Sequence, residues 1–161
     1  MRRGLPLAMS VLALVYLCSG CAKPKLIPNT KLKDTEVNRE VLKAVMTYQR
    51  AMESRSAAAV LSVVHPLYQD NAGTPEGSDD RDYEGIKKLL ATHFQNTTKI
   101  RYRIEFLDIT LNGREAEVFV YIDATFVFEP QESLPRWRRM ADHHRYRLLK
   151  DGGRWMFLSG L

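Results

Sequence analysis

The sequence from Ile100 to Phe128 reads IRYRIEFLDITLNGREAEVFVYIDATFVF, and apolar and polar side chains alternate along most of it. A period of two residues is typical of β-strands that have one face in a core and the other in solvent. Asn112-Gly113 separates two alternating runs, and this dipeptide is a strong signal for a tight hairpin turn. The stretch therefore predicts a long antiparallel hairpin at the centre of the fold.

The first strand of this hairpin changes phase part-way along. Its apolar side chains occupy even positions from Ile100 to Phe106 and odd positions from Leu107 to Leu111, whereas the second strand, Ala116 to Phe128, never changes parity. A strand cannot exchange its faces against an unbroken partner unless one residue stays unpaired. We therefore predict a β-bulge within Ile104–Asp108, which would curve the sheet.

The turns predict the register of the strands. If Asn112-Gly113 forms the first turn, Ile109 lies opposite Ala116. If the later Asp151-Gly152 turn is equally tight, Leu148 lies opposite Trp155.

The other predicted elements are three helices before this hairpin and two strands after it. Apolar residues recur every three or four positions in the helices, and Thr35 is a good N-cap for the first. The expected ranges are Glu36–Ser54, Ala57–Val64 and Tyr83–Phe94 for the helices and Trp137–Lys150 and Arg154–Leu161 for the strands.

The chain begins with the layout of a secretory signal peptide: Arg2 and Arg3, an apolar run from Leu5 to Cys18, and the small residues Ser19-Gly20. The apolar run is shorter than the roughly 20 residues that a membrane-spanning helix needs. Ordinary cleavage, for example after Ala22, would release a secreted domain.

The ending Ser19-Gly20-Cys21 resembles the lipobox of bacterial lipoproteins. The resemblance implies a signal peptide at 1–20, acylation of Cys21, a tether over 21–35 and a folded domain over 36–161. Proline-rich segments extend about 3.1 Å per residue, so the tether would reach roughly 40 Å from the membrane. Ala22 is not the Asp that retains many such lipoproteins in the inner membrane, so the resemblance implies the outer membrane, facing the periplasm.

Composition suits one domain with its own core, because 45% of the residues are apolar. Loss of Arg2 and Arg3 with the signal peptide lowers the formal net charge from +5 to +3. That mild excess gives no reason to expect nucleic acid as a partner.

The domain resembles the nuclear transport factor 2-like superfamily, which includes SnoaL-like and ketosteroid-isomerase-like domains. The residues that carry the resemblance are Tyr48-x-x-Ala51, Tyr83-Glu84-Gly85 and Gly153-Arg154-Trp155-Met156-Phe157. It implies an α+β fold in which three N-terminal helices pack on a curved antiparallel sheet of about four long strands, forming a cone around an apolar pocket. Members include enzymes, ligand binders and scaffolds, so the fold does not decide the function.

Candidate site residues fall on the predicted inner face. Asp142 and His144 share one face of a strand, and a carboxylate that orients a histidine is an arrangement for general-base chemistry. The alternative is a solvated Asp142 beside a histidine at the sheet edge. The histidines lack any metal-ligand spacing, so we expect neither a metal nor another cofactor. The expected pocket residues are Tyr48, Tyr68, Tyr102, Tyr146 and Trp155. The alternative is that these aromatic side chains only fill the core, as most aromatic residues at core periodicity do.

A run of arginines surrounds Trp137. It is either a solvated strand face or a surface for lipid phosphates or an acidic partner, which guanidinium groups bind with paired hydrogen bonds. The run consists of Arg136, Arg138, Arg139, Arg145 and Arg147.

These features predict an envelope lipoprotein whose domain binds a small apolar ligand or a protein partner without catalysis. One alternative is an enzyme of the dehydratase, isomerase or cyclase type, and another is a structural subunit of an envelope complex. A homodimer through the sheet is a further expectation. A pocket with converging polar groups would favour the enzyme. A purely apolar pocket would favour binding without catalysis, and a pocket filled by side chains would favour the structural role.

Overall fold

The computed structural model describes residues 24–71, 80–128 and 135–161; the predicted signal peptide and Cys21 lie outside these ranges. No helix in the described part of the chain is both long and apolar enough to span a bilayer. The helices are α1 (Glu36–Glu53), α2 (Ala57–Leu61) and α3 (Tyr83–Gln95). The strands are β1 (Gln69–Asp70), β2 (Arg81–Asp82), β3 (Thr97–Asn112), β4 (Glu115–Phe128), β5 (Arg136–Asp151) and β6 (Arg154–Ser159).

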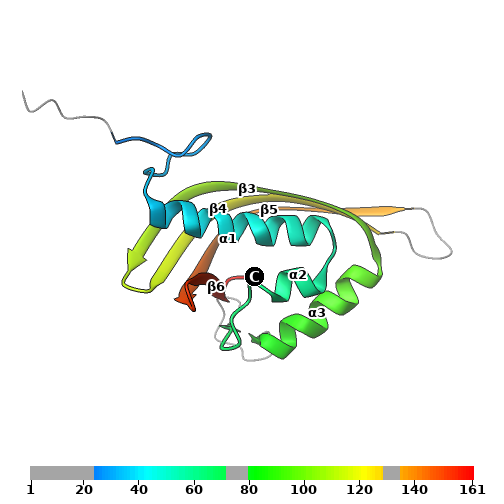
Figure 1. Ribbon diagram of the computed structural model, residues 1–161. Coiled ribbons are helices and arrows are strands. Elements are labelled where there is room, and N and C mark those ends of the chain that lie inside the picture. Colours follow the sequence, from blue (N-terminus) through cyan, green and yellow to red (C-terminus); the bar gives the residue numbers. More distant parts are fainter. Residues whose placement is uncertain (1–23, 72–79, 129–134) are drawn as a thin grey trace, which may run out of the picture.

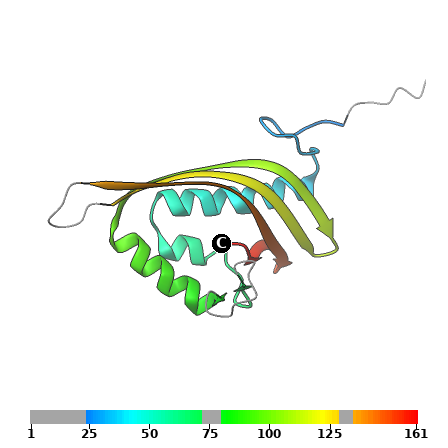
Figure 2. The ribbon, with the colours of Figure 1, turned by 180° about the vertical axis from the view of Figure 1, so that it is seen from behind.

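The main sheet is antiparallel, in the order β3-β4-β5-β6, and the short strands β1 and β2 pair separately. The long strands arch over α1, and α2 and α3 lie further inside the arch (Figures 1 and 2). The inward side chains of the sheet meet those of the helices in one core, in which Val118, Val120 and Ile122 are fully buried. The α+β class and the curved antiparallel sheet are therefore confirmed.

The predicted bulge is present in β3. Phe106 pairs with Val120 and Asp108 with Phe119, so Leu107 is the extra residue. It lies within the predicted Ile104–Asp108 window, and it lets the apolar positions on both sides of it face the core.

The predicted turns are displaced, although the faces of the strands are as expected. Leu111, not Ile109, pairs with Ala116. The turn therefore begins at Gly113, which takes a φ of 59°, as the first central residue of a type II′ hairpin turn does.

The β5–β6 turn is displaced in the same way. Its central residues are Gly152 and Gly153, whose φ values of 52° and 78° are those of a type I′ turn. Leu148 consequently pairs with Phe157, and the prediction that it lies opposite Trp155 is wrong.

The helices begin where their caps predict. The Thr35 hydroxyl accepts a hydrogen bond from the N–H of Asn38 at 3.1 Å, and the Asp82 carboxylate accepts one from Gly85 at 2.7 Å. The helix α2 ends earlier than predicted because the chain after it pairs with β6. There the N–H of His65 donates to the carbonyl of Phe157 at 2.9 Å.

The segment before α1 is folded rather than extended. Its backbone turns at Pro28 and Asn29, which has a φ of 62°, and the Thr30 N–H donates to the Ile27 carbonyl at 3.0 Å. Proline followed by a residue with positive φ is the pattern of a type II turn. Ile27 and Leu32 are thereby buried, so the prediction of an extended spacer up to residue 35 is wrong for this part.

Candidate functional site

A cavity of about 200 Å³ lies between the concave face of the sheet and the helices. The helices α1 and α3 form one wall and the strands β3, β4 and β5 the other. The lining is mostly apolar, since alternation along the strands and the apolar faces of the helices both point into it. The lining residues are Tyr48, Met52, Val60, Ile86, Leu89, Leu90, His93, Phe94, Tyr102, Phe126, Met140, His144, Gly160 and Leu161.

Tyrosine side chains supply polar groups at one side of this cavity. Tyr48 and Tyr102 line it, with their rings edge to face and their centroids 5.7 Å apart. Tyr146 packs behind them, 6.1 Å from the Tyr48 ring, and its buried hydroxyl has no hydrogen-bond partner in the described structure. Burial, and then the neighbouring phenols, raise the pKa of all three hydroxyls. They therefore stay protonated at neutral pH and can donate hydrogen bonds.

Two histidines reach the cavity from opposite walls. His144, on β5, is half-buried and pairs with Val120 across the sheet. His93, on α3, packs against Phe126 with ring centroids 5.3 Å apart, and its Nε2 atom is buried without a partner. Burial, and then the charge of Arg138, lower the pKa of His93, so this imidazole is neutral at pH 7.

The structure separates the two residues that the sequence suggested as a catalytic pair. His144 lines the cavity, whereas Asp142 is exposed and outside it. The Asp142 carboxylate accepts a hydrogen bond from the backbone N–H of its neighbour His143 at 2.7 Å. The two side chains leave the same strand face, but they form no hydrogen bond in the described structure.

Of the predicted pocket residues, Tyr48 and Tyr102 line the cavity and the others do not. The hydroxyl of Tyr68 donates to Asp70 at 3.1 Å and accepts from the Leu161 N–H at 3.0 Å. The Trp155 indole instead donates to Glu40 on α1 at 3.1 Å. These side chains belong to the supporting core because their polar atoms are occupied there.

The arginine run does not form one surface. Alternation along β5 places Arg136 and Arg138 on the concave side and Arg139 and Arg145 on the convex side, and all of them are exposed. Arg139 forms two hydrogen bonds with Asp123, at 2.8 and 3.1 Å. Arg147, also on the convex side and exposed, donates to Glu115 at 3.1 Å.

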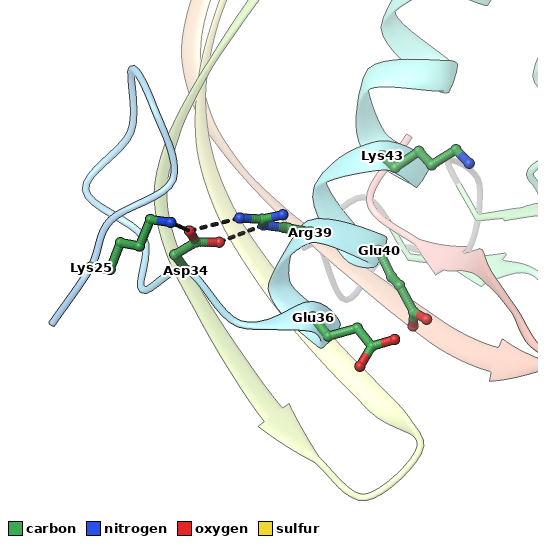
Figure 3. A pocket seen from close by; sticks show the side chains of 6 residues that line it. All are labelled: Lys25, Asp34, Glu36, Arg39, Glu40 and Lys43. Atoms are coloured by element: carbon green, nitrogen blue, oxygen red, sulfur yellow. Dashed lines mark hydrogen bonds and ion pairs between the residues drawn. The ribbon is translucent and has the colours of Figure 1, made fainter.

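A second, shallower hollow of about 490 Å³ lies at the start of α1 (Figure 3). Its charged side chains largely pair with one another: Arg39 donates to Asp34 at 2.8 Å, and Lys25 lies 3.6 Å from the same carboxylate. The Arg39 hydrogen bond holds the pKa of Asp34 below its usual value. Glu40 already accepts hydrogen bonds from Lys150 and Trp155. We therefore take the apolar cavity as the candidate site.

Within the described ranges, no group of three or more His, Cys, Asp or Glu side chains could hold a metal ion. No protein-family model and no curated protein matches the sequence.

Solved structures do resemble it. A protein of the NTF2-like family from Streptomyces avermitilis superposes with a TM-score of 0.64 at 13% identity, over 76% of this chain and 92% of the other. The domain has the nuclear transport factor 2-like fold.

Other proteins of similar fold have names that refer to enzymes. A ketosteroid isomerase-like protein from Erwinia carotovora atroseptica has a TM-score of 0.63 at 14% identity, over 78% of this chain and 94% of that one. A hexachlorocyclohexane dehydrochlorinase (LinA) type 2 has a TM-score of 0.62 at 10% identity, over 77% and 82%. At such low identity the likeness concerns the nuclear transport factor 2-like fold.

The sequence analysis missed His93 as a cavity residue. A signal for it exists, because His93 follows Leu89 and Leu90 by four and three residues and so shares their face of α3. Met140, on the β5 wall, was not predicted either, because the arginines around it obscure the apolar alternation of that part of the strand.

Proposed function

We propose that the cavity binds a small, largely apolar molecule carrying one oxygen atom, and that His144 removes a proton from it. The protein would then be an enzyme of the isomerase or dehydratase type. The observation that carries the proposal is the placement of two tyrosines and two imidazoles, those of His93 and His144, on the wall of a mostly apolar cavity. Enzymes named among the proteins of similar fold support the same class.

Each group has a role in this chemistry. The His144 imidazole takes the proton from a carbon next to a carbonyl, and the electron pair of that C–H bond moves toward the carbonyl oxygen. The hydroxyl of Tyr48 or Tyr102 donates a hydrogen bond to the oxygen as it gains negative charge, which stabilises the transition state. Return of the proton to another carbon completes an isomerisation. Departure of a leaving group with its electron pair from the adjacent carbon completes an elimination.

A second candidate is binding without catalysis. It is favoured by one observation: no Asp or Glu of the described chain lines the cavity, so no carboxylate orients His144 there. In this case the tyrosine hydroxyls would only fix the orientation of the ligand.

One experiment separates these functions. The full chain is mixed in D₂O with a panel of small cyclic ketones, and NMR records both ligand binding and deuterium uptake next to the carbonyl. Catalysis predicts uptake by the wild type and a loss of about 10²-fold or more in His144→Gln, which still binds. Asp142→Asn, an exposed control outside the cavity, should keep the wild-type rate. Binding without uptake supports the second candidate, and absence of binding contradicts both and leaves the structural role.

We also infer from the sequence that Cys21 is acylated and that the domain is held at the outer membrane, facing the periplasm. Support comes from the basic start, the apolar run and the Ser19-Gly20-Cys21 ending. An anchored domain would act on, or bind, molecules that enter the periplasm. An envelope protein and a second copy of the chain remain proposed partners.

A further inference from the structure

One end of the convex face of the sheet concentrates positive charge around an exposed indole. We define this basic end as Lys99, Arg101 and Arg103 of β3 together with Trp137 and Arg139 of β5. All five residues are exposed, and within the described ranges Trp137 is the most exposed large apolar residue after Leu67, at 72%.

The register of the strands brings these residues together. Lys99 and Trp137 both pair with Val127 of β4, one from each side. Arg101 and Arg139 flank the β4 residue two positions before Val127 in the same way. The basic end therefore spans three adjacent strands, and it includes a surface hollow of about 200 Å³ lined by Lys99, Arg101, Thr125 and Val127.

Little of this charge is neutralised within the protein. Asp123 faces the basic end, but its carboxylate is hydrogen-bonded to Arg139. That bond, and then the charges of Arg139, Arg103 and Arg101, hold the pKa of Asp123 below its usual value. Lys99, Arg101 and Arg103 make no ion pair within the described part of the chain.

The charge is concentrated rather than general to this face. Towards the opposite end of the same strands, the convex positions carry both signs of charge. Asp108 on β3 and Glu115 and Glu117 on β4 lie near Arg145 and Arg147 on β5, and Arg147 is hydrogen-bonded to Glu115. A partner that responds to the basic end should therefore bind at one end of the arch and not across the whole sheet.

We propose that the basic end docks on the headgroups of an anionic phospholipid bilayer. Cations near a bilayer are attracted by its negative surface potential, and an indole is enriched at the boundary between headgroups and acyl chains. Lys99, Arg101 and Arg103 supply the first element and Trp137 the second. The described N-terminal segment from residue 24 lies at the end of the arch where α1 begins, beside the β3–β4 hairpin and opposite to the basic end (Figures 1 and 2). The basic end would therefore give the domain a membrane contact separate from its N-terminus, and the docking does not depend on the chemistry of the cavity.

The test uses the fluorescence of Trp137 in the full chain, whose only other tryptophan, Trp155, is buried. Vesicles contain brominated phosphatidylcholine, either alone or with about one third phosphatidylglycerol. Bromine quenches an indole that reaches the acyl boundary. We expect strong quenching on the anionic vesicles, little on the neutral ones, and reversal by added salt. A Trp137→Phe chain gives the background of Trp155.

A charge-matched pair of variants locates the contact. Lys99→Ala/Arg101→Ala/Arg103→Ala removes the unpaired cations of the basic end, and each contributes about a fivefold factor near an anionic surface, so docking should weaken about a hundredfold. Arg145→Ala/Arg147→Ala/Arg154→Ala removes the same charge from the opposite end of β5 and β6, where these residues are exposed, and should quench like the wild type. Circular dichroism and thermal melts verify that both variants fold.

Three outcomes would overturn the proposal. They are equal quenching on neutral and anionic vesicles, equal loss in the two triple variants, and absence of quenching on anionic vesicles. The last would indicate an acidic protein, or a second copy of the chain, as the partner of this surface.

Discussion

The side-chain carboxylate of Glu53 accepts a hydrogen bond from the backbone N–H of Tyr102 at 3.0 Å. Glu53 is the last residue of α1, and Tyr102 lies on the edge strand β3. The hydrogen bond therefore satisfies one N–H donor on the open edge of the sheet. Arg55 extends the same contact by donating to the carbonyl of Thr97. Because Tyr102 lines the cavity, the end of α1 also fixes one wall of the candidate site.

We therefore expect Glu53→Ala to lower the free energy of unfolding by about 1–2 kcal/mol, because a partly buried N–H loses its charged acceptor. Glu53→Gln, whose amide oxygen can still accept, should lose less than half of that. Urea unfolding of the three proteins measures the difference. An alanine variant as stable as the wild type would show that water replaces the carboxylate at no cost.

The bulge makes a different prediction about deletions. Removing Leu107 takes away the unpaired residue and leaves Phe106 and Asp108 on their present faces. The domain should therefore fold with a flatter sheet and a changed cavity. Deleting Glu105 is absorbed in a similar way, since Leu107 can then occupy the inward place of Phe106. That deletion should accordingly not prevent folding.

Deleting Tyr121 from β4 is the matched control. The strand β4 is paired on both sides, and the described structure shows no extra residue in it. The side chains before the deletion must therefore exchange the inward and outward faces of the sheet. Val118 and Val120 would each lose about 1.5–3 kcal/mol of burial, against a total stability of roughly 5–15 kcal/mol. We expect this variant to be unfolded or barely stable in thermal melts. Equal melting of the Leu107 and Tyr121 deletions would contradict the role of the bulge.

The bulge could be predicted from the sequence because the apolar side chains of β3 change from even to odd positions there. Parity does not record register, since a shift by two residues keeps every side chain on its face. That is why Ile109 was assigned the partner that Leu111 has, and Leu148 the partner that Lys150 has. The positive φ of the glycines decides the turns, and this depends on the strands on both sides.

The candidate site was predictable only in part for a related reason. Periodicity shows that Tyr68, Tyr146 and Trp155 point inward, but not whether another side chain already meets them there. Glu40 comes from α1, far away in the sequence, and satisfies the Trp155 indole. Tyr146, whose hydroxyl has no hydrogen-bond partner in the described structure, is instead covered by the rings of Tyr48 and Phe157. The cavity forms where such contacts leave space, at Tyr48, Tyr102 and His144.

Lipid attachment is tested at Cys21. If the Ser19-Gly20-Cys21 ending is processed as its resemblance implies, Cys21→Ser should abolish incorporation of a labelled fatty acid and either release the domain from the membrane or leave the precursor uncleaved. Cys18→Ser, three residues earlier and within the predicted signal peptide, is the control and should label normally. Equal labelling of Cys21→Ser and wild type would refute the assignment.

The half-buried imidazole of His93 should make the fold sensitive to acid. Burial and Arg138 hold its pKa below the ordinary value of 6.5, so near and below pH 6.5 the unfolded chain binds more protons than the folded one. The contribution of His93 to stability is therefore fully present above pH 6.5 and is lost as the pH falls through the lowered pKa.

His93→Phe removes this titration and also an Nε2 atom that has no partner in the described structure, next to Phe126 and Phe128. We expect the variant to equal or exceed the wild type by up to about 1 kcal/mol at pH 7, and to lose less stability on acidification. Denaturant unfolding at several pH values measures both effects. His143→Phe, on the exposed convex face, should keep the wild-type acid loss; the same loss in His93→Phe would mean that other groups cause it.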